Sequence, residues 1–151
     1  MLEELNIGDC ITIDNKASIN FTGRDDFEIK HIENYETDEG ELVTIYLGEY
    51  YLIYNLFSGL PKIYILELFD EVYSDLYFHK ENFTKKIKIE GGNGEVIYRQ
   101  SPTGQKYSEE QEAFFCEYSS KDFLNTILLK RTESGIDIFR GFEINEEDIV
   151  N

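Results

Sequence analysis

Residues 50–69 read YYLIYNLFSGLPKIYILELF, and this stretch decides the fold class of the chain. Its two halves, 50–54 and 63–69, are dense in aromatic and β-branched residues, which are typical of strands. Between them, 58–61 reads SGLP and supplies the Gly and Pro that a turn needs. Neither half alternates regularly with polar residues, so we expect a central β-hairpin with both faces covered.

The segments on either side of this hairpin alternate apolar and polar residues, which is the period of a half-buried strand. Turn-forming residues interrupt them at short intervals. The alternating segments include 10–14, 27–32, 85–90 and 136–139, and the turns fall at 6–9, 23–26, 38–41, 91–94, 101–104 and 133–135. The chain is therefore expected to be mainly β, an antiparallel meander that forms a sandwich or a barrel, with at most one or two short helices.

The local pattern leaves some elements open. Residues 108–114 begin with SEEQ, which fits a capping box, so they are either a helix or the start of a strand through 115–118. Residues 120–124 are the second candidate for a short helix. Asn93-Gly94 stands between two alternating segments, and this dipeptide predicts a hairpin turn there rather than a phosphate-binding loop.

The size and composition favour one folded unit. A chain of 151 residues with 41% hydrophobic and 15% aromatic residues is long enough for one core, and no Pro/Ser-rich linker divides it. We expect a single acidic domain over residues 1–151. No apolar run approaches the ~20 residues of a transmembrane helix and the first residues do not resemble a secretory signal, so we predict a cytoplasmic protein that does not insert into membranes.

Negative charge is unevenly distributed along the chain. The net charge is −17; residues 1–79 hold 17 acids and 4 bases, whereas residues 80–151 hold 14 acids and 10 bases. Such a field repels nucleic acid and attracts basic surfaces. We therefore expect a basic protein surface as partner and no direct contact with nucleic acid. The difference in charge between the two halves of the chain is also compatible with head-to-tail association into a homo-oligomer.

No arrangement of side chains predicts catalysis, a metal site or a cofactor. Cys10 and Cys116 are distant in sequence and have acidic or apolar neighbours, which do not lower a thiol pKa, so we expect two reduced, partly buried thiols. The two histidines, His31 and His79, are expected to be surface residues. The many carboxylates single out no catalytic pair. Residues 38–41 (DEGE) read as an acidic hairpin turn rather than a calcium loop, and Glu146-Glu147-Asp148 as a solvated tail.

Three parts of the chain carry a resemblance. They are LNIGD at 5–9, LGEYYL at 47–52, and NTILL at 125–129 leading through ESG at 133–135 to FRGFEI at 139–144. Their order resembles a family of small bacterial β-rich proteins of unknown function, often encoded beside phage-shock-like membrane-stress genes. The tryptophans of that family are absent here. The resemblance implies no catalytic residue.

These observations lead to one main functional hypothesis. We predict a non-enzymatic acidic binding protein, an inhibitor or immunity-type factor that covers a basic, nucleic-acid-handling surface of another protein. An anti-CRISPR or toxin-neutralising protein would be one case. The alternatives are a scaffold or stress-operon component, as the resemblance would imply, and a metal-dependent carboxylate enzyme. The predicted partner-binding residues are Asp25, Asp26, Glu28, Glu33, Tyr35, Glu36, Asp38, Glu39 and Glu41. For the tyrosines nearby, packing in the core is the alternative role.

Overall fold

A computed structural model describes residues 4–37, 40–56, 61–68, 83–89, 93–98, 107–112, 114–120, 124–132 and 135–151. Its elements are one α-helix, thirteen strands and a 3-10 turn within these ranges. In chain order they are β1 (Cys10–Ile13), α1 (Lys16–Thr22), β2 (Asp26–Glu28), β3 (His31–Thr37), β4 (Gly40–Tyr46), β5 (Tyr50–Asn55), β6 (Lys62–Leu68), β7 (Phe83–Ile89), β8 (Asn93–Tyr98), β9 (Tyr107–Glu112), β10 (Phe114–Ser120), β11 (Thr126–Thr132), β12 (Gly135–Ile144), η2 (Glu146–Asp148) and β13 (Ile149–Val150).

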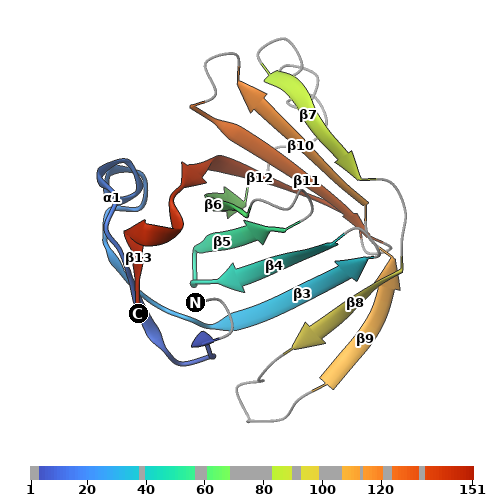
Figure 1. Ribbon diagram of the computed structural model, residues 1–151, viewed down its shortest axis with the longest axis horizontal. Coiled ribbons are helices and arrows are strands. Elements are labelled where there is room, and N and C mark those ends of the chain that lie inside the picture. Colours follow the sequence, from blue (N-terminus) through green and yellow to red (C-terminus); the bar gives the residue numbers. More distant parts are fainter. Residues whose placement is uncertain are drawn as a thin grey trace.

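The predicted mainly β, antiparallel fold is confirmed (Figure 1). The largest sheet has eight strands in the order β3-β4-β5-β6-β12-β11-β10-β7. Its centre is the predicted hairpin, with β5 paired to β6 from Tyr50 opposite Glu67 to Asn55 opposite Lys62. Both faces of this hairpin are buried, since Leu52 and Ile53 are adjacent in sequence and belong to different core clusters.

The large sheet folds over so that its two ends pack against each other. In a flat sheet β3 and β11, five positions apart, would be separated by about 24 Å, because neighbouring strands lie ~4.8 Å apart. Yet Lys130 Nζ on β11 lies 2.9 Å from Glu33 Oε1 on β3. Figure 1 shows the two halves as separate groups of arrows, β7, β10 and β11 above and β3 and β4 below.

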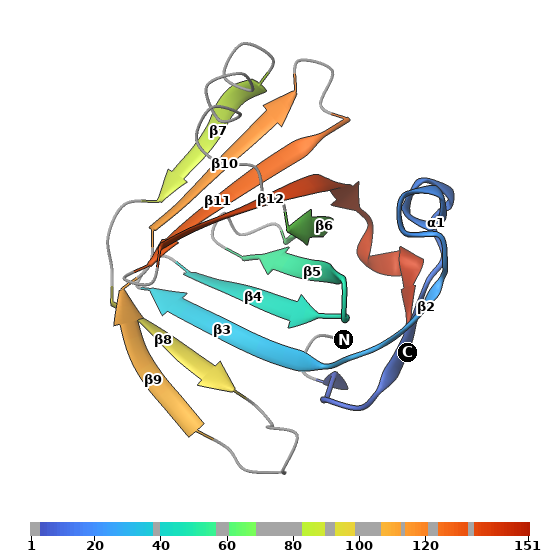
Figure 2. The ribbon, with the colours of Figure 1, turned by 180° about the vertical axis from the view of Figure 1, so that it is seen from behind.

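The two halves form layers rather than a closed barrel. Between them lies a core cluster that joins Tyr35 and Leu42 to Leu128 and Phe139. Among the described residues no pairing joins β3 to β7, so the sheet stays open and its layers pack face to face, as in a sandwich. The two-stranded sheet β8-β9 runs beside β3, as both ribbon views show (Figure 2).

A second, three-stranded sheet in the order β13-β1-β2 brings the beginning and end of the chain together. Thr12 pairs with Val150 on one side and with Asp26 on the other. The buried side chains of this sheet, Ile11, Phe27 and Ile149, share a core cluster with the outer face of β3 to β6. The hairpin is therefore covered by the small sheet on one face and by the folded half of the large sheet on the other.

The helix α1 was not among the predicted elements. Its local signals are nevertheless present: the Asn15 side chain caps the Ser18 N–H, and Gly23, with φ of 82°, ends the helix. Phe21 holds the helix against the sheet through Phe142, at 5.4 Å between ring centroids, and Tyr50, at 5.6 Å. Seven residues are too few for a stable isolated helix, so these contacts supply its stability.

One local prediction was wrong, and for another segment the structure decides between the two alternatives. Asn93 and Gly94 form no turn between β7 and β8; they begin β8, where they pair with Glu112 and Gln111 of β9. The possible helix at 108–114 is also not formed, because 107–112 is β9 and 114–120 is β10, so the strand alternative applies. Of the second candidate helix, Ser120 ends β10 and residues 121–123 lie outside the described residues.

At Gly141 β12 lies close to the backbone of β6. This glycine lies opposite Leu66 on one side and Thr126 on the other. A Cβ atom at this position would lie 1.9 Å from the carbonyl oxygen of Ile65, well inside van der Waals contact. Only glycine allows this approach, and the clash is with backbone, which cannot rotate away.

We expect Gly141→Ala to destabilise the fold by roughly 1–3 kcal/mol or more, because the added methyl group must push β12 away from β6. Urea unfolding measures this free energy. Glu143→Ala is the matched control, since Glu143 lies two residues along the same strand and is exposed; it should change stability by no more than about 0.5 kcal/mol. Equal effects of the two substitutions would contradict the close approach.

Candidate functional site

The predicted partner-binding residues fall into two groups. Asp25, Asp26 and Glu28 are exposed at β2, the edge strand of the small sheet. Asp26 accepts a hydrogen bond from the Thr12 hydroxyl at 2.6 Å, and Glu28 forms an ion pair with Lys30 at 2.9 Å. These three carboxylates are accessible to a partner.

The second group lies on β3 and β4 and is less accessible. Glu33 pairs with Lys130, and its side chain is only 21% exposed. Glu41 is half-buried and accepts a hydrogen bond from the Asn34 amide at 2.9 Å. Glu36 is known only by its backbone position opposite Glu41, and Asp38 and Glu39 lie outside the described residues.

Tyr35 belongs to the core rather than to the surface. Its side chain is 1% exposed, and the Lys130 ammonium lies 4.7 Å from its ring centroid. Tyr54 is also buried, and Tyr46, Tyr50 and Tyr51 are half-buried. For these tyrosines the alternative of core packing applies, so the accessible part of the predicted surface is acidic and not aromatic.

The structure adds acids that the sequence did not single out for binding. Glu146-Glu147-Asp148 is not a loose tail: it forms η2, and Asp148 Oδ2 accepts hydrogen bonds from the Asn145 N–H at 3.1 Å and the Asn15 side-chain amide at 2.9 Å. Asp14 donates its N–H to the Asp148 carbonyl at 2.7 Å. On the other side of β1, Ile13 donates its N–H to the Asp25 carbonyl at 2.8 Å.

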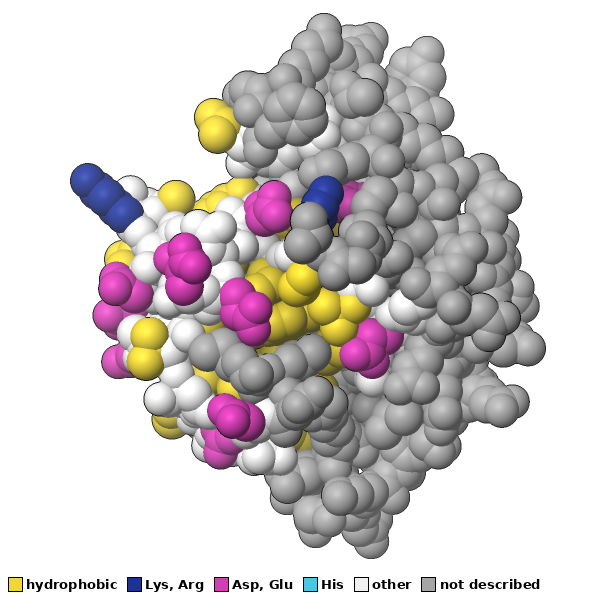
Figure 3. Space-filling model, in the orientation of Figure 1, with side chains coloured by type: hydrophobic (Ala, Val, Ile, Leu, Met, Phe, Trp, Pro, Cys, Tyr) yellow, Lys and Arg dark blue, Asp and Glu magenta, His cyan; other side chains and the backbone are white. Residues whose placement is uncertain are grey.

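These contacts bring three segments together at one end of the small sheet. We call the acids gathered there the terminal patch; its members are Asp14, Asp25, Asp26, Glu146, Glu147 and Asp148. All are exposed except the half-buried Asp148. Acidic side chains also predominate over basic ones on the described part of the face in Figure 3. The patch offers a concentrated negative field to a basic surface.

The space between the layers of the large sheet holds an unusual carboxyl group. Glu117 on β10 is 2% exposed, and it accepts a hydrogen bond from the Tyr64 hydroxyl on β6. Burial raises its pKa to about 7; the charge of Glu143 acts in the same direction, and Lys62 opposes it. A lone acid among the aromatic residues of 114–118 (FFCEY) was the sequence signal for this position.

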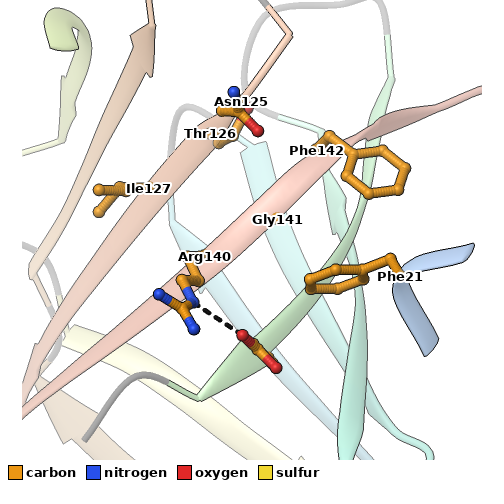
Figure 4. A pocket seen from close by; sticks show the side chains of 8 residues that line it. Phe21, Asn125, Thr126, Ile127, Arg140, Gly141 and Phe142 are labelled. Atoms are coloured by element: carbon orange, nitrogen blue, oxygen red, sulfur yellow. Dashed lines mark hydrogen bonds and ion pairs between the residues drawn. The ribbon is translucent and has the colours of Figure 1, made fainter. Parts of the chain in front are cut away.

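A pocket of about 310 Å³ lies where α1, β6, β11 and β12 meet. Phe21 and Phe142 form one wall, and Arg140 forms another, joined to Glu67 by an ion pair of 2.7 Å (Figure 4). Because Arg140 and Glu67 neutralise each other, the walls favour an apolar or aromatic group over an ion.

Several chemistries lack a site in the described part of the chain. No three His, Cys, Asp or Glu side chains there come together in a way that could hold a metal ion. No helix in these ranges is long and apolar enough to cross a membrane. Cys10 is a free thiol and, contrary to the expectation of partial burial, it is exposed.

Comparison with known proteins gave no relative: the chain matches no protein-family model, no curated protein and no solved structure.

The ion pair between Glu33 and Lys130 should contribute measurably to stability, because it joins the two layers and its side chains are only 21% and 14% exposed. We expect Lys130→Met to cost roughly 1–3 kcal/mol, since it leaves Glu33 without its cation. Adding Glu33→Gln to that variant should recover part of the loss.

Urea unfolding of the single and double variants gives the coupling energy of this pair. Lys30→Met with Glu28→Gln is the matched control, because that pair is about half exposed and a surface pair contributes at most about 1 kcal/mol. A coupling energy no larger than that of the control would show that the Glu33–Lys130 contact does not hold the layers together.

Proposed function

We propose that this protein is a non-enzymatic binding protein whose acidic surface covers a basic surface of a partner protein. The observation that carries the proposal is the terminal patch, in which acids from three segments of the chain gather at one end of the small sheet. Strand pairing and backbone hydrogen bonds hold these segments together, and a surface that already has its bound arrangement loses less conformational entropy on binding.

The remaining charges support the same reading. The described acids that lie between the layers are paired or carry a raised pKa, as at Glu33 and Glu117. Those of the terminal patch are exposed except the half-buried Asp148, and the nearest basic side chains in sequence are the exposed Lys16 and Arg24. Arg24 lies over the Phe27 ring, 4.8 Å from its centroid. The exposed acids of the terminal patch outnumber these two bases, so this end of the small sheet presents net negative charge to solvent.

The chemistry that would recognise this surface is a cluster of lysine and arginine side chains, such as the nucleic-acid-binding face of an enzyme. By occupying such a face the protein would act as an inhibitor or immunity-type factor, and anti-CRISPR or toxin-neutralising activity is the concrete case. Electrostatic complementarity would speed association and orient the partner.

The first test is a low-salt pull-down with the native protein, followed by reversal of three exposed patch charges. We expect Asp25→Lys, Glu146→Lys and Glu147→Lys together to slow association with the captured partner by at least about tenfold, with little change in dissociation. Surface plasmon resonance at several salt concentrations measures both rates.

A matched triple variant separates patch and net charge. Glu49→Lys, Asp137→Lys and Glu143→Lys change the net charge equally at exposed positions outside the terminal patch. This control should slow association only slightly. Equal slowing by both variants would show that association depends on net charge and not on the terminal patch. A complex unaffected by either variant would contradict the proposal. Stable self-association without a basic partner would favour the scaffold alternative.

A further inference from the structure

Glu117 on β10 forms a buried hydrogen bond with Tyr64 on β6, across the space between the two layers of the large sheet. Both side chains are titratable. In the sheet order β12 and β11 separate these two strands. The Tyr64 hydroxyl reaches Glu117 Oε1, whereas the second oxygen, Oε2, is buried and has no hydrogen-bond partner among the described atoms. A carboxylate in this position would be both poorly solvated and half satisfied.

The charged groups that the structure describes around Glu117 do not compensate for this. Lys62 on β6 favours the ionised form, but Glu143 on β12 opposes it, and both effects are smaller than that of burial. Lys130 on β11 is held by Glu33 of β3. The neighbouring strand β7 contributes Lys85, Lys86 and Lys88 in sequence, with side chains outside the described set. With its pKa raised to about 7, Glu117 is protonated in mildly acidic solution and loses its proton near neutrality.

The position of β10 offers a way to relieve an ionised Glu117. Its backbone hydrogen bonds go to β11 and β7, on its own half of the sheet, and not to β6. Opening of this half away from β3 to β6 would therefore hydrate the carboxylate, and without that covering layer the hydrogen bonds of β10 to β11 and β7 can break while β3 to β6 stay paired. The two folded halves are thus units that can open separately.

We propose that the Glu117–Tyr64 contact is a pH-sensitive closure, which holds the two halves of the large sheet together while the carboxyl group is protonated and loosens them when it ionises. This goes beyond the binding function, which depends on the terminal patch of the small sheet.

Proton linkage determines whether opening becomes easier or harder as the pH rises, and over which pH range it changes. The closed state binds the Glu117 proton more tightly than the open state, where the carboxyl returns toward its ordinary pKa of 4.5. Opening therefore releases a proton, and its equilibrium constant rises up to tenfold per pH unit between 4.5 and about 7. Above about 7 both states are ionised and the opening constant levels off. The total increase is on the order of a hundredfold.

Amide hydrogen exchange at several pH values, corrected for the intrinsic rate, tests the closure. We expect the opening constants of the Glu117 and Leu128 amides to rise on the order of a hundredfold across this window and then level off. The amides of Val43 and Ile45 on β4 should not follow. The same profile on β4 would mean global unfolding and would overturn the proposal, as would no pH dependence at β10.

Glu117→Gln is the decisive variant, because Gln keeps an oxygen for the Tyr64 hydroxyl and stays neutral at every pH. Its β10 amides should remain protected through pH 8, whereas Glu49→Gln, a change at an exposed acid that is not among the charges acting on Glu117, should keep the wild-type profile. A wild-type profile in Glu117→Gln would overturn the proposal.

A direct titration covers the case in which that variant does not fold. The ¹³C chemical shift of the Glu117 carboxyl in the wild-type protein should have its midpoint near 7. A midpoint near the ordinary value of 4.5 would overturn the closure without any variant.

Discussion

The close approach of β12 to β6 at Gly141 is the constraint on which the rest of the fold depends. Because Gly141 has no side chain, β12 can lie close over the backbone of β6, and β11 and β10, which follow β12 in the sheet order, lie across β3 to β6. This places a second layer on the central hairpin and buries both of its faces. Without it, Ile53, Tyr64 and Leu66 would face water.

Folding the sheet over also determines where polar groups lie. The strands of the two facing layers carry Glu33, Lys130 and Glu117, which would be ordinary surface residues on a flat, half-exposed sheet. In the folded sheet two of them form an ion pair, and the third meets a tyrosine hydroxyl. Each contact offsets part of the free-energy cost of removing these groups from water. Among the described atoms Glu117 Oε2 has no hydrogen-bond partner, so a negative charge on this carboxyl group would be poorly compensated.

The candidate binding surface could be predicted only in part. Charge counting located an acidic excess in the first half of the chain, and Asp25, Asp26 and Glu28 are indeed exposed. It could not find Glu146 beside them, because the pairing of β1 with β13 is a contact between the two ends of the chain, nor Asp14, which lies beside Asp25 only through the pairing of β1 with β2. Charge counting also could not distinguish the exposed acids from the largely covered Glu33. A strand at the surface and a strand covered by a second layer can show the same alternation of apolar and polar residues.

The sequence by itself determined the strands, the central hairpin, and the acidic character of the molecule, because periodicity, turn chemistry and charge are local or additive properties. It also carried the helix signal, with Asn15 and Gly23 at the ends of α1, although the pattern of a helix of only seven residues is weak evidence. The turn predicted at Asn93-Gly94 was wrong, because in the structure these residues pair with β9 despite their turn propensity. Only the tertiary structure decided which strands face each other across the fold, and hence the patch, the ion pair and the buried acid. These depend on long-range contacts, such as that of Asn15 with Asp148, 133 positions apart, which no local pattern encodes.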